Sequence, residues 1–293
     1  MQKTHHHTAA EGTESDVMYT LRPLLTTYAY NITGSLEEAR DLVQDAYLRF
    51  MQATATVENP RAYLVRTVIN LSINRQQQRK RTGYPGEWLP EPVATDMPDG
   101  PLLSKDVLRY SLMVLLEKLN ARERAVFILR EAFSYTFAEI AALLGTSEAN
   151  TRQLLSRAKK QLRNYRPAAD ATAVQTFPDK YLALIREGDT ERLEALLKED
   201  IVAVSDGGGK VPAAQQPVAG RKAVSALLQG MYNKFYQAKD VRSGSVNHQP
   251  ALFYYHEGRL TNCQVFTLED GCISGVYFIR NPEKLQALDF LKK

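Results

Sequence analysis

Residues 136–163 read TFAEIAALLGTSEANTRQLLSRAKKQLR, and this stretch decides the fold of the middle of the chain. Thr136 and Glu139 form a capping box, which predicts a short helix that ends at Gly145. Ser147 then caps a second helix after a turn of only a few residues. Two helices joined by so short a turn are typical of a helix-turn-helix motif.

The second helix of this motif has the chemistry of a DNA-reading helix. Its first turns, where such motifs contact bases, carry Glu148, Asn150, Thr151, Arg152 and Gln153. Phosphate contacts are expected from Arg157, Lys159, Lys160 and Arg163. Six basic residues and one acid lie between 147 and 166, which favours DNA binding over a solvated helix face. The predicted shared core of the two helices consists of Ile140, Leu143, Leu154, Leu155 and Ala158.

Residues 16–82 are predicted to be all-helical. Gly34 ends a first helix, and Ser35 with Glu38 opens a second one. The predicted buried face of this second helix consists of Ala39, Leu42, Val43, Ala46, Tyr47 and Phe50. Its outer face includes Asp41, Gln44, Asp45 and the apolar Leu48. A solvated face would explain these residues, but acids around an apolar side chain also suit docking on another protein.

Asn59 and Pro60 predict the start of a third helix. Its inner face is expected to hold Ala62, Val65, Ile69 and Ile73. Its other face carries Arg66, Asn70 and Asn74, spaced four residues apart, and such side chains can hydrogen-bond base edges and phosphates. The stripe ends in a basic cluster formed by Arg75, Arg79, Lys80 and Arg81. The cluster favours nucleic acid over a solvent-facing polar stripe.

Residues 83–103 are rich in Pro and Gly and carry four acids and no base, which predicts a linker. The linker contains Trp88, the only tryptophan of the chain, which is expected to pack on a domain.

Residues 168–293 have zero net charge and an α+β pattern, which predicts a separate domain that does not itself bind DNA. Helices are expected near 174–187, 190–197 and 221–235. Strands are expected near 241–248, 251–257, 259–268 and 272–280, with Asp270-Gly271 as a hairpin turn. DGGGK at 206–210 follows a further strand but lacks the spacing of a phosphate-binding loop.

These segments together resemble an extracytoplasmic-function (ECF) sigma factor. Residues 37–50, 59–81 and 119–163 look like its second and fourth regions, in the right order. GEWLPEP at 86–92, SDGGGK at 205–210 and NPEKL at 281–285 further resemble the group with a SnoaL-like C-terminal extension. Asn74 stands where an Asp is usual in the family, and Tyr63 where a Trp is usual.

The resemblance implies a multidomain fold with two all-α sigma domains and an α+β SnoaL-like cone. The first sigma domain would be a helical bundle and the second would contain the helix-turn-helix. The expected parts are a flexible tail at 1–15, sigma region 2 at 16–82, the linker at 83–103, sigma region 4 at 104–167 and the SnoaL-like domain at 168–293.

The resemblance also implies the partners, which are core RNA polymerase and promoter DNA. Polymerase would dock on Asp41, Gln44, Asp45 and Leu48. The loop from Met51 to Glu58 would hold a flipped minus-ten base beside Arg66, Asn70 and Asn74, with the basic cluster nearby. The helix-turn-helix would read the minus-thirty-five element.

A regulatory role in cis is implied for the C-terminal domain, without a separate anti-sigma protein. The residues expected to join the domains are Trp88, Leu89, Pro90, Asp206, Gly207, Gly208, Gly209, Lys210, Asn281 and Pro282. A compact free form that hides the face around Asp45 and Leu48 would have to open before polymerase could bind.

Two other functions stay open on the residues alone. One is a one-component DNA-binding regulator, and the other is a SnoaL-like isomerase or cyclase fused to a DNA-binding module. The cone could hold a small ligand, and its candidate catalytic groups are His248, His256, Tyr254, Tyr255, Asp206 and Cys263. No pair among them has a spacing that argues for catalysis, so no enzyme activity, cofactor or metal is expected. Two cysteines, and no signal peptide or membrane span, favour a cytoplasmic protein.

Overall fold

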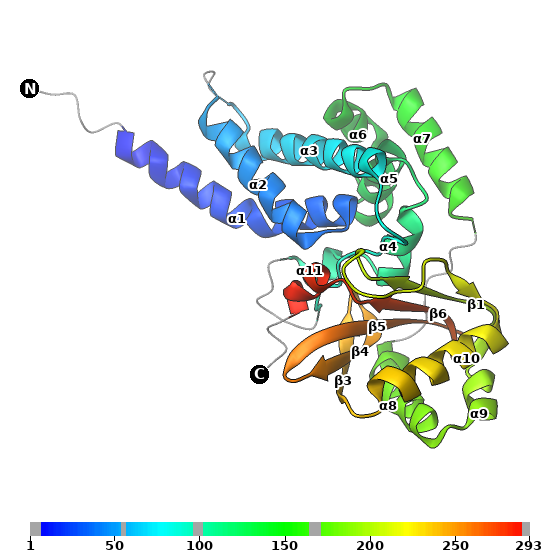
Figure 1. The fold of residues 1–293 in the computed structure, drawn as a ribbon. Helices are drawn as coiled ribbons and strands as arrows, with labels where there is room; N and C mark the ends of the chain where they lie inside the picture. The colour runs from blue at the N-terminus through cyan, green and yellow to red at the C-terminus, as the bar shows by residue number, and fades with distance from the viewer. Residues whose placement is uncertain (1–6, 54–56, 96–101, 164–170, 289–293) are drawn as a thin grey trace, which may run out of the picture. The chain divides into compact units, whose positions relative to one another are not determined.

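The computed structural model describes residues 7–53, 57–95, 102–163 and 171–288 (Figure 1). The chain divides into two compact units. The first consists of Met1–Arg81, Asp99–Val107 and Leu119–Gln161, and the second of Thr82–Pro98, Leu108–Lys118 and Leu162–Lys293. The second unit therefore takes in much of the predicted linker and the start of the predicted fourth region.

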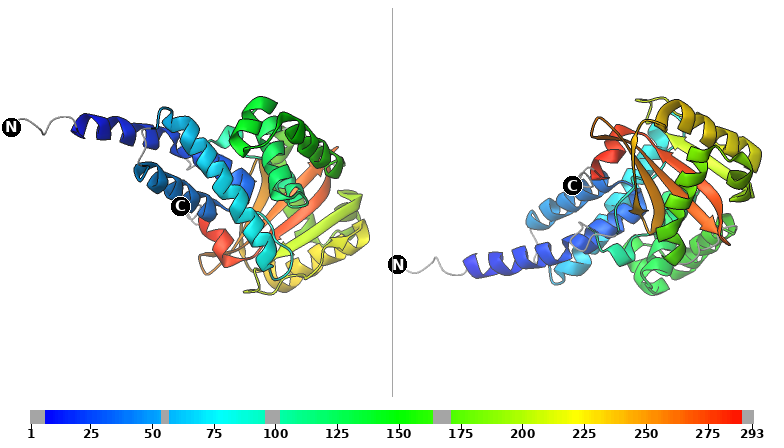
Figure 2. Two further views of the ribbon diagram at one scale, coloured as in Figure 1. Left: turned by 90° about the horizontal axis from the view of Figure 1, so that it is seen from above. Right: turned by 90° about the horizontal axis from the view of Figure 1, so that it is seen from below.

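Three helices open the first unit: α1 (His7–Thr33), α2 (Leu36–Met51) and α3 (Pro60–Thr82). Helices α1 and α2 lie side by side in both views of Figure 2. Gly34 separates them with a φ of +77°, and the Ser35 hydroxyl accepts a hydrogen bond from the Glu38 N–H. Because α1 begins at His7, helix extends into the stretch 1–15 that was expected to be a tail.

The buried faces of α2 and α3 largely follow the apolar periodicity. Five of the six residues predicted for the inner face of α2 are buried, and Tyr47 is partly buried. In α3, Val65, Ile69 and Ile73 are buried, but Ala62 is exposed. The buried stripe of α3 begins at Leu64, so the first turn of this helix lies in solvent.

The helix-turn-helix forms as predicted. It consists of α6 (Phe137–Leu144) and α7 (Glu148–Gln161). The elements η1 (Ser104–Asp106), α5 (Ala121–Phe127) and the π-helical turn η2 (Ile128–Ala132) precede it in the same unit. Thr136 and Glu139 make a reciprocal capping box, and Gly145 ends α6 in the left-handed conformation, with a φ of +61°. The core differs at one position, because Leu144 is buried while Leu143 is partly exposed. The predicted boundary at 167 lies outside the described residues.

The second unit is α+β. Its helices are α4 (Tyr110–Leu116), α8 (Ala171–Glu187), α9 (Thr190–Ala195), α10 (Arg221–Met231) with the π-helical turn η3 (Tyr232–Tyr236), and α11 (Pro282–Leu285). Its strands are β1 (Leu197–Asp206), β2 (Val218–Ala219), β3 (Asp240–Val246), β4 (Gln249–His256), β5 (Arg259–Glu269) and β6 (Cys272–Ile279).

The strands form one sheet in the order β2-β1-β6-β5-β4-β3. Strands β3 to β6 pair antiparallel in sequence order, whereas β1 joins β6 in parallel. Asp270 and Gly271 both have positive φ and make the predicted hairpin turn. Strand β1 is the one expected before DGGGK, and β2 was not predicted because two residues give no alternation to detect.

Two apolar cores cover the two faces of the sheet. Helices α8, α9 and α10 cover one face, which we call the inner face, through residues such as Tyr181, Leu193 and Leu228. The opposite face is covered by Leu89 of the linker, Tyr110 of α4 and α11. Three helices against a curved sheet form the predicted SnoaL-like cone. The linker and α4 complete its second layer.

Candidate functional site

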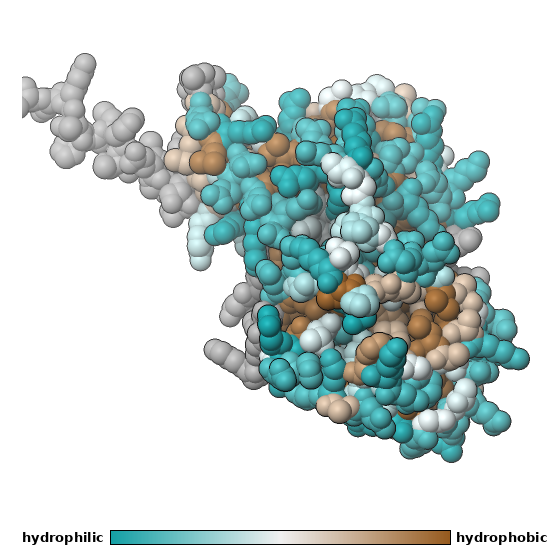
Figure 3. All heavy atoms as spheres, in the orientation of Figure 1, coloured by the Kyte–Doolittle hydropathy of each residue, from teal (hydrophilic) through white to brown (hydrophobic). Residues whose placement is uncertain are grey.

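The outer face of α7 presents most of the side chains predicted to contact DNA. Glu148, Arg152 and Gln153 are exposed, as are the basic residues Arg157, Lys159 and Lys160. The Arg152 guanidinium is bonded to the Glu148 carboxylate at 3.1 Å and lies over the Phe137 ring, 4.1 Å from its centroid. Hydrophilic side chains predominate over this helix in Figure 3. The pair and the ring orient Arg152 on the helix surface.

Two residues of the predicted base-reading set are turned inward. Thr151 has no exposed surface, and its hydroxyl donates to the Ser147 carbonyl at 3.0 Å. Asn150 is partly buried, and its amide donates to the Thr146 hydroxyl at 2.7 Å. Thr151 therefore belongs to the core of the motif and is left out of the DNA-reading set.

The outer face of α2 is open in this structure. Asp41, Gln44 and Asp45 are exposed, and Leu48 is 50% exposed. Within the first unit, these side chains are therefore accessible on the surface of α2.

The polar stripe of α3 lines an open pocket. Arg66, Asn70 and Asn74 surround a volume of about 320 Å³ together with Arg49, Tyr63, Thr67 and Leu71. The Asn70 amide donates to the Arg66 carbonyl at 2.9 Å and to the Leu143 carbonyl of α6 at 3.3 Å. The stripe thus contacts the helix-turn-helix within the same unit. Residues 54–56 of the loop expected beside this pocket lie outside the described residues.

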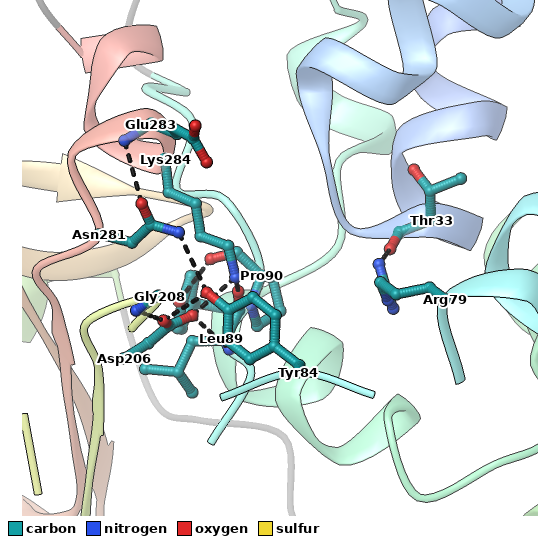
Figure 4. Close-up of polar contacts among 11 residues, drawn as sticks. Thr33, Arg79, Tyr84, Leu89, Pro90, Asp206, Gly208, Asn281, Glu283 and Lys284 are labelled. Atoms are coloured by element: carbon teal, nitrogen blue, oxygen red, sulfur yellow. Dashed lines mark hydrogen bonds and ion pairs between the residues drawn. The ribbon is translucent and has the colours of Figure 1, made fainter. Parts of the chain in front are cut away.

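The basic cluster at the end of α3 is largely engaged by protein groups. Arg79 donates to the Thr33 carbonyl at the end of α1, at 2.5 Å (Figure 4), and Lys80 donates to the Leu119 carbonyl. Burial, with Arg124 and Arg79 nearby, lowers the pKa of Lys80. Arg75 lies 3.6 Å from the Glu38 carboxylate, and Arg81 is exposed. Arg79 and Lys80, two of the cations predicted to contact phosphates, therefore donate hydrogen bonds to backbone carbonyl oxygens of the protein itself.

A fully buried arginine joins the two halves of the first unit. Arg124 of α5 has no exposed surface, and its Nε and Nη2 donate to the Asn31 carbonyl of α1 at 3.1 and 3.0 Å. The Asn31 amide in turn donates to the Asp106 carbonyl at 2.9 Å. Burial, with Arg79 nearby, lowers the pKa of Arg124. Sequence reasoning missed Arg124, because an arginine in a short amphipathic helix normally points to solvent.

In the second unit, the Asp206 carboxylate connects the linker to the sheet (Figure 4). It accepts hydrogen bonds from the Tyr84 hydroxyl at 2.7 Å, the Leu89 N–H at 2.9 Å and the Gly208 N–H at 2.9 Å. Asp206 is 1% exposed. Burial raises the pKa of Tyr84, and the hydrogen bond to Asp206 raises it further. One buried carboxylate thus organises the linker and the DGGGK turn together.

Lys284 supplies the counter-charge from the NPEKL segment. Its ammonium lies 2.6 Å from Asp206, donates to the Leu89 carbonyl and lies 4.0 Å from the Trp88 ring centroid. We call Tyr84, Leu89, Asp206, Asn281 and Lys284 the linker anchor. The sequence singles out the motifs DGGGK and NPEKL, but it assigns no individual role to Tyr84 or Lys284. A tyrosine in a linker is only partly buried in most proteins, and a lysine in a short helix usually lies in solvent.

The remaining residues expected to join the domains surround the anchor. The Asn281 amide donates to the Tyr84 hydroxyl at 3.0 Å, and its oxygen caps α11. Lys210 pairs with Glu283, and Pro282 is the exposed first residue of α11. The Pro90 carbonyl accepts a hydrogen bond from Tyr110 at 2.7 Å.

Each glycine of DGGGK lies where a side chain would collide with a neighbour. A Cβ on Gly207 would lie 2.2 Å from the Val211 carbonyl oxygen. One on Gly208 would lie 2.4 Å from the Asn281 amide nitrogen, and one on Gly209 would lie 2.8 Å from Pro85. The glycines therefore allow the strand end, NPEKL and the linker to approach one another closely.

A second contact holds the linker and α4 on the β3–β4 turn. The Asn247 backbone N–H donates to the Val93 carbonyl at 2.9 Å, and the Asn247 Oδ1 accepts from the Val93 N–H at 3.0 Å. The Asn247 Nδ2 donates to the Leu108 carbonyl at 3.1 Å. Gln249 accepts from the Ser111 N–H at 2.5 Å. No sequence signal pointed to Asn247, because a turn asparagine ordinarily serves only its own turn.

The candidate catalytic groups of the cone are dispersed. Cys263 and Tyr255 lie in the core on the side of the linker, where burial raises the pKa of the Cys263 thiol. Tyr254 faces the inner side, and His256 is exposed. Within the described residues, no three His, Cys, Asp or Glu side chains are grouped to hold a metal ion. No described helix combines the length and apolar character needed to span a membrane.

Comparisons with known proteins agree with this arrangement. Residues 18–82 match Sigma-70 region 2, and residues 109–162 match Sigma-70, region 4. The ECF RNA polymerase sigma factor SigJ of Mycobacterium tuberculosis is 30% identical over 300 residues, which cover 90% of each chain. The probable ECF sigma factor SigI of the same organism is 24% identical over 276 residues, covering 91% of this chain and 93% of its own.

The crystal structure of Mycobacterium tuberculosis SigJ is similar over nearly the whole chain. It matches with a TM-score of 0.75 and 31% sequence identity, covering 93% of this chain and 98% of that one. The two helical regions, the cone that follows them and the similarity along the full length lead to one conclusion. The chain belongs to the extracytoplasmic-function family of RNA polymerase sigma factors, and it carries a C-terminal SnoaL-like domain.

Proposed function

We propose that the C-terminal domain regulates this sigma factor in cis by holding the linker between regions 2 and 4. The observation that carries the proposal is the Asp206 carboxylate, which bonds the linker at Tyr84 and Leu89. A free, fully extended linker of residues 83–103 could span about 70 Å. With Leu89, Val93 and α4 fixed on the sheet, most of that reach is lost. Anchoring therefore limits how far apart the two DNA-binding regions can lie on a promoter.

The test is promoter-dependent run-off transcription by purified core polymerase with full-length variants of the linker anchor. A chain ending at Pro167 is a poorer test, because it would expose Leu89, Val93 and Tyr110, which are buried here. Transcription by the wild-type chain establishes promoter initiation. Unchanged output from variants that release the linker would contradict control by the anchor.

The proposed polymerase-docking face is Asp41, Gln44, Asp45 and Leu48 on α2. Leu48 is half-exposed among acids, which suits the centre of a protein interface. We expect Leu48→Asp to weaken binding to core polymerase at least about tenfold, measured by fluorescence anisotropy. Tyr19→Asp changes another exposed apolar side chain, 81% accessible on α1, and should leave binding unchanged. Equal loss in both variants would argue against a specific face.

For promoter contacts we propose two surfaces. The pocket beside Arg66, Asn70 and Asn74 would receive an unstacked minus-ten base, with Arg75, Arg79, Lys80 and Arg81 on phosphates. The face of α7 formed by Glu148, Arg152 and Gln153 would read the minus-thirty-five duplex, with Asn150 at its edge and Arg157, Lys159 and Lys160 on phosphates. The Asn70–Leu143 and Lys80–Leu119 contacts support a closed form that opens on DNA.

Arg124 provides a test of this closed form. Arg124→Met removes both hydrogen bonds to the Asn31 carbonyl while keeping a side chain of similar length, so α5 should separate from α1 more readily. We expect tighter binding of the free protein to a minus-thirty-five duplex, by about threefold to tenfold, in a gel-shift assay. Arg122→Met, at an exposed position of the same helix, is the matched control. Weaker DNA binding by Arg124→Met, with native helical content, would contradict the closed form.

We further propose that this internal control takes the place of a separate anti-sigma protein, and that the factor acts in the cytoplasm without catalysing a reaction. The anchor is built entirely from residues of this chain, which supports the first point. The dispersed His, Tyr and Cys groups of the cone support the last. Capture of a dedicated inhibitory protein by the full-length chain would contradict the proposal.

A further inference from the structure

The inner face of the sheet carries two neighbouring amide side chains on β5. Both polar atoms of the Gln264 side chain have a partner, since its Oε1 accepts from the Tyr254 hydroxyl at 2.6 Å and its Nε2 donates to the Tyr181 hydroxyl at 3.1 Å. Asn262, two residues away and on the same face, has no exposed surface, and no described protein group bonds its Oδ1 or Nδ2. The two amides differ in their partners although both are buried.

Two further unpartnered polar atoms belong to the same part of the cone. Cys263 pairs with Ile279 at the end of the β5–β6 ladder, so Asn262 and Arg280, each adjacent in sequence to one member of this pair, lie at the same end of the ladder. The Arg280 Nε is buried and has no protein partner among the described residues. The same is true of the hydroxyl of Tyr236, which is 4% exposed. Buried polar groups left without partners cost free energy, so such a group of them needs an explanation.

The charge in this region is positive. The pKa of Lys239 is lowered mainly by burial and further by the nearby charge of Arg280. The same charge opposes the rise that burial causes in the pKa of Tyr236. The Lys239 ammonium lies 3.5 Å from the Thr261 hydroxyl. Within the described part of the chain, no carboxylate forms an ion pair with Lys239 or Arg280. Two neighbouring cations without a counter-ion favour an anionic ligand.

An aromatic side chain lies beside these cations. Phe235 is 44% exposed, and the Arg280 guanidinium lies 5.9 Å from its ring centroid. An exposed aromatic next to buried polar groups is the usual composition of a small-molecule site, in which apolar contact supplies affinity and a few polar groups fix orientation.

We propose that Asn262, Tyr236 and Arg280, with Lys239 beside them, form a binding site for a small carboxylate that bears an apolar part. The Arg280 Nε and the Lys239 ammonium donate to the carboxylate oxygens. The Asn262 amide and the Tyr236 hydroxyl hold the adjacent polar atoms, and Phe235 contacts the apolar part. This binding site does not depend on the proposed regulation. Arg280 also contacts the end of β1 and the segment that follows it, because its guanidinium donates to the Pro212 carbonyl and its backbone N–H donates to the Asp206 carbonyl.

The test is thermal unfolding of the full-length chain at constant ionic strength, with benzoate as the probe and neutral benzamide as its isostere. We expect 10 mM benzoate to raise Tm by about 2–4 °C and benzamide to leave it unchanged. The same measurement with acetate, a carboxylate without a ring, shows whether the ring is needed for the rise in Tm. Inorganic phosphate shows whether any anion suffices. A larger rise with phosphate than with benzoate would overturn the assignment to a carboxylate.

Substitutions locate the effect. Asn262→Leu and Arg280→Met should each abolish the rise, whereas Arg259→Met, at an exposed position on the same strand, should retain it. Without ligand, Asn262→Leu should raise Tm, because an apolar side chain of similar size replaces an unpartnered amide. No rise with benzoate or acetate in the wild-type chain, or an equal rise in Asn262→Leu, would overturn the site. A lower Tm for ligand-free Asn262→Leu would show that the protein itself satisfies this amide.

Discussion

Lys284→Met is expected to lower the free energy of unfolding of the C-terminal unit by about 3–5 kcal/mol, because it leaves the Asp206 carboxylate buried without its counter-charge. The Asp206 side chain has no exposed surface and that of Lys284 is 10% exposed, so water cannot replace the lost partner. Urea unfolding followed by tryptophan fluorescence measures the change. Trp88 is the only tryptophan, and its ring lies against the substituted ammonium, so it reports on the anchor itself.

The control for this prediction is Lys222→Met, which changes an exposed lysine of α10 and should alter stability by less than about 0.5 kcal/mol. The double variant Asp206→Asn with Lys284→Met should cost less than the sum of the single changes, since the two groups contact each other directly. Strict additivity would mean that the 2.6 Å pair contributes nothing of its own to stability.

Gly208→Ala is expected to destabilise the same unit by about 2–5 kcal/mol. Part of the cost is the left-handed backbone at φ +64°, and part is the approach of the new Cβ to the Asn281 amide at 2.4 Å. Asn281 cannot easily move away, because it donates to Tyr84 and caps α11. Run-off transcription should change at least about threefold if the anchor controls the linker.

Gly258→Ala separates the two causes. Gly258 has a φ of +72°, but nothing lies within 4 Å of its Cβ position, so its substitution carries the backbone cost alone, about 1–2 kcal/mol. Its transcription should equal that of the wild-type chain. If Gly208→Ala and Gly258→Ala lose the same stability and transcribe equally, close approach at the DGGGK turn has no role in control.

Features coded by local sequence were predictable. The Thr136–Glu139 capping box, Gly145 and Ser147 gave the helix-turn-helix because caps and turns depend on neighbouring residues. The apolar periodicity of α2 likewise predicted that Leu48 lies on the exposed face of the helix. The motifs around Trp88, Asp206 and Asn281 were recognised as belonging together only through resemblance to a family. Their spacing alone does not bring them to one place.

Features decided by distant contacts were not predictable. Arg124 is buried because the Asn31 carbonyl of another helix accepts both of its donors. Thr151 turned out to be core because α7 packs its first turn against the rest of the motif. Asn247 and Gln249 bond the linker and α4 because the fold brings the β3–β4 turn against those two segments. Periodicity carries no information about these partners, which are 93 to 154 residues away in the sequence.

The parallel pairing of β1 with β6 also bears on the order in which the protein becomes complete during synthesis. Asp206 and Lys284 are separated by 78 residues, and Lys284 follows the last strand of the sheet. Because chains fold from the N-terminus as they leave the ribosome, the helices up to Gln161 can form well before the anchor does. A nascent chain would therefore pass through a stage in which both promoter-binding regions are present and the linker is still untied.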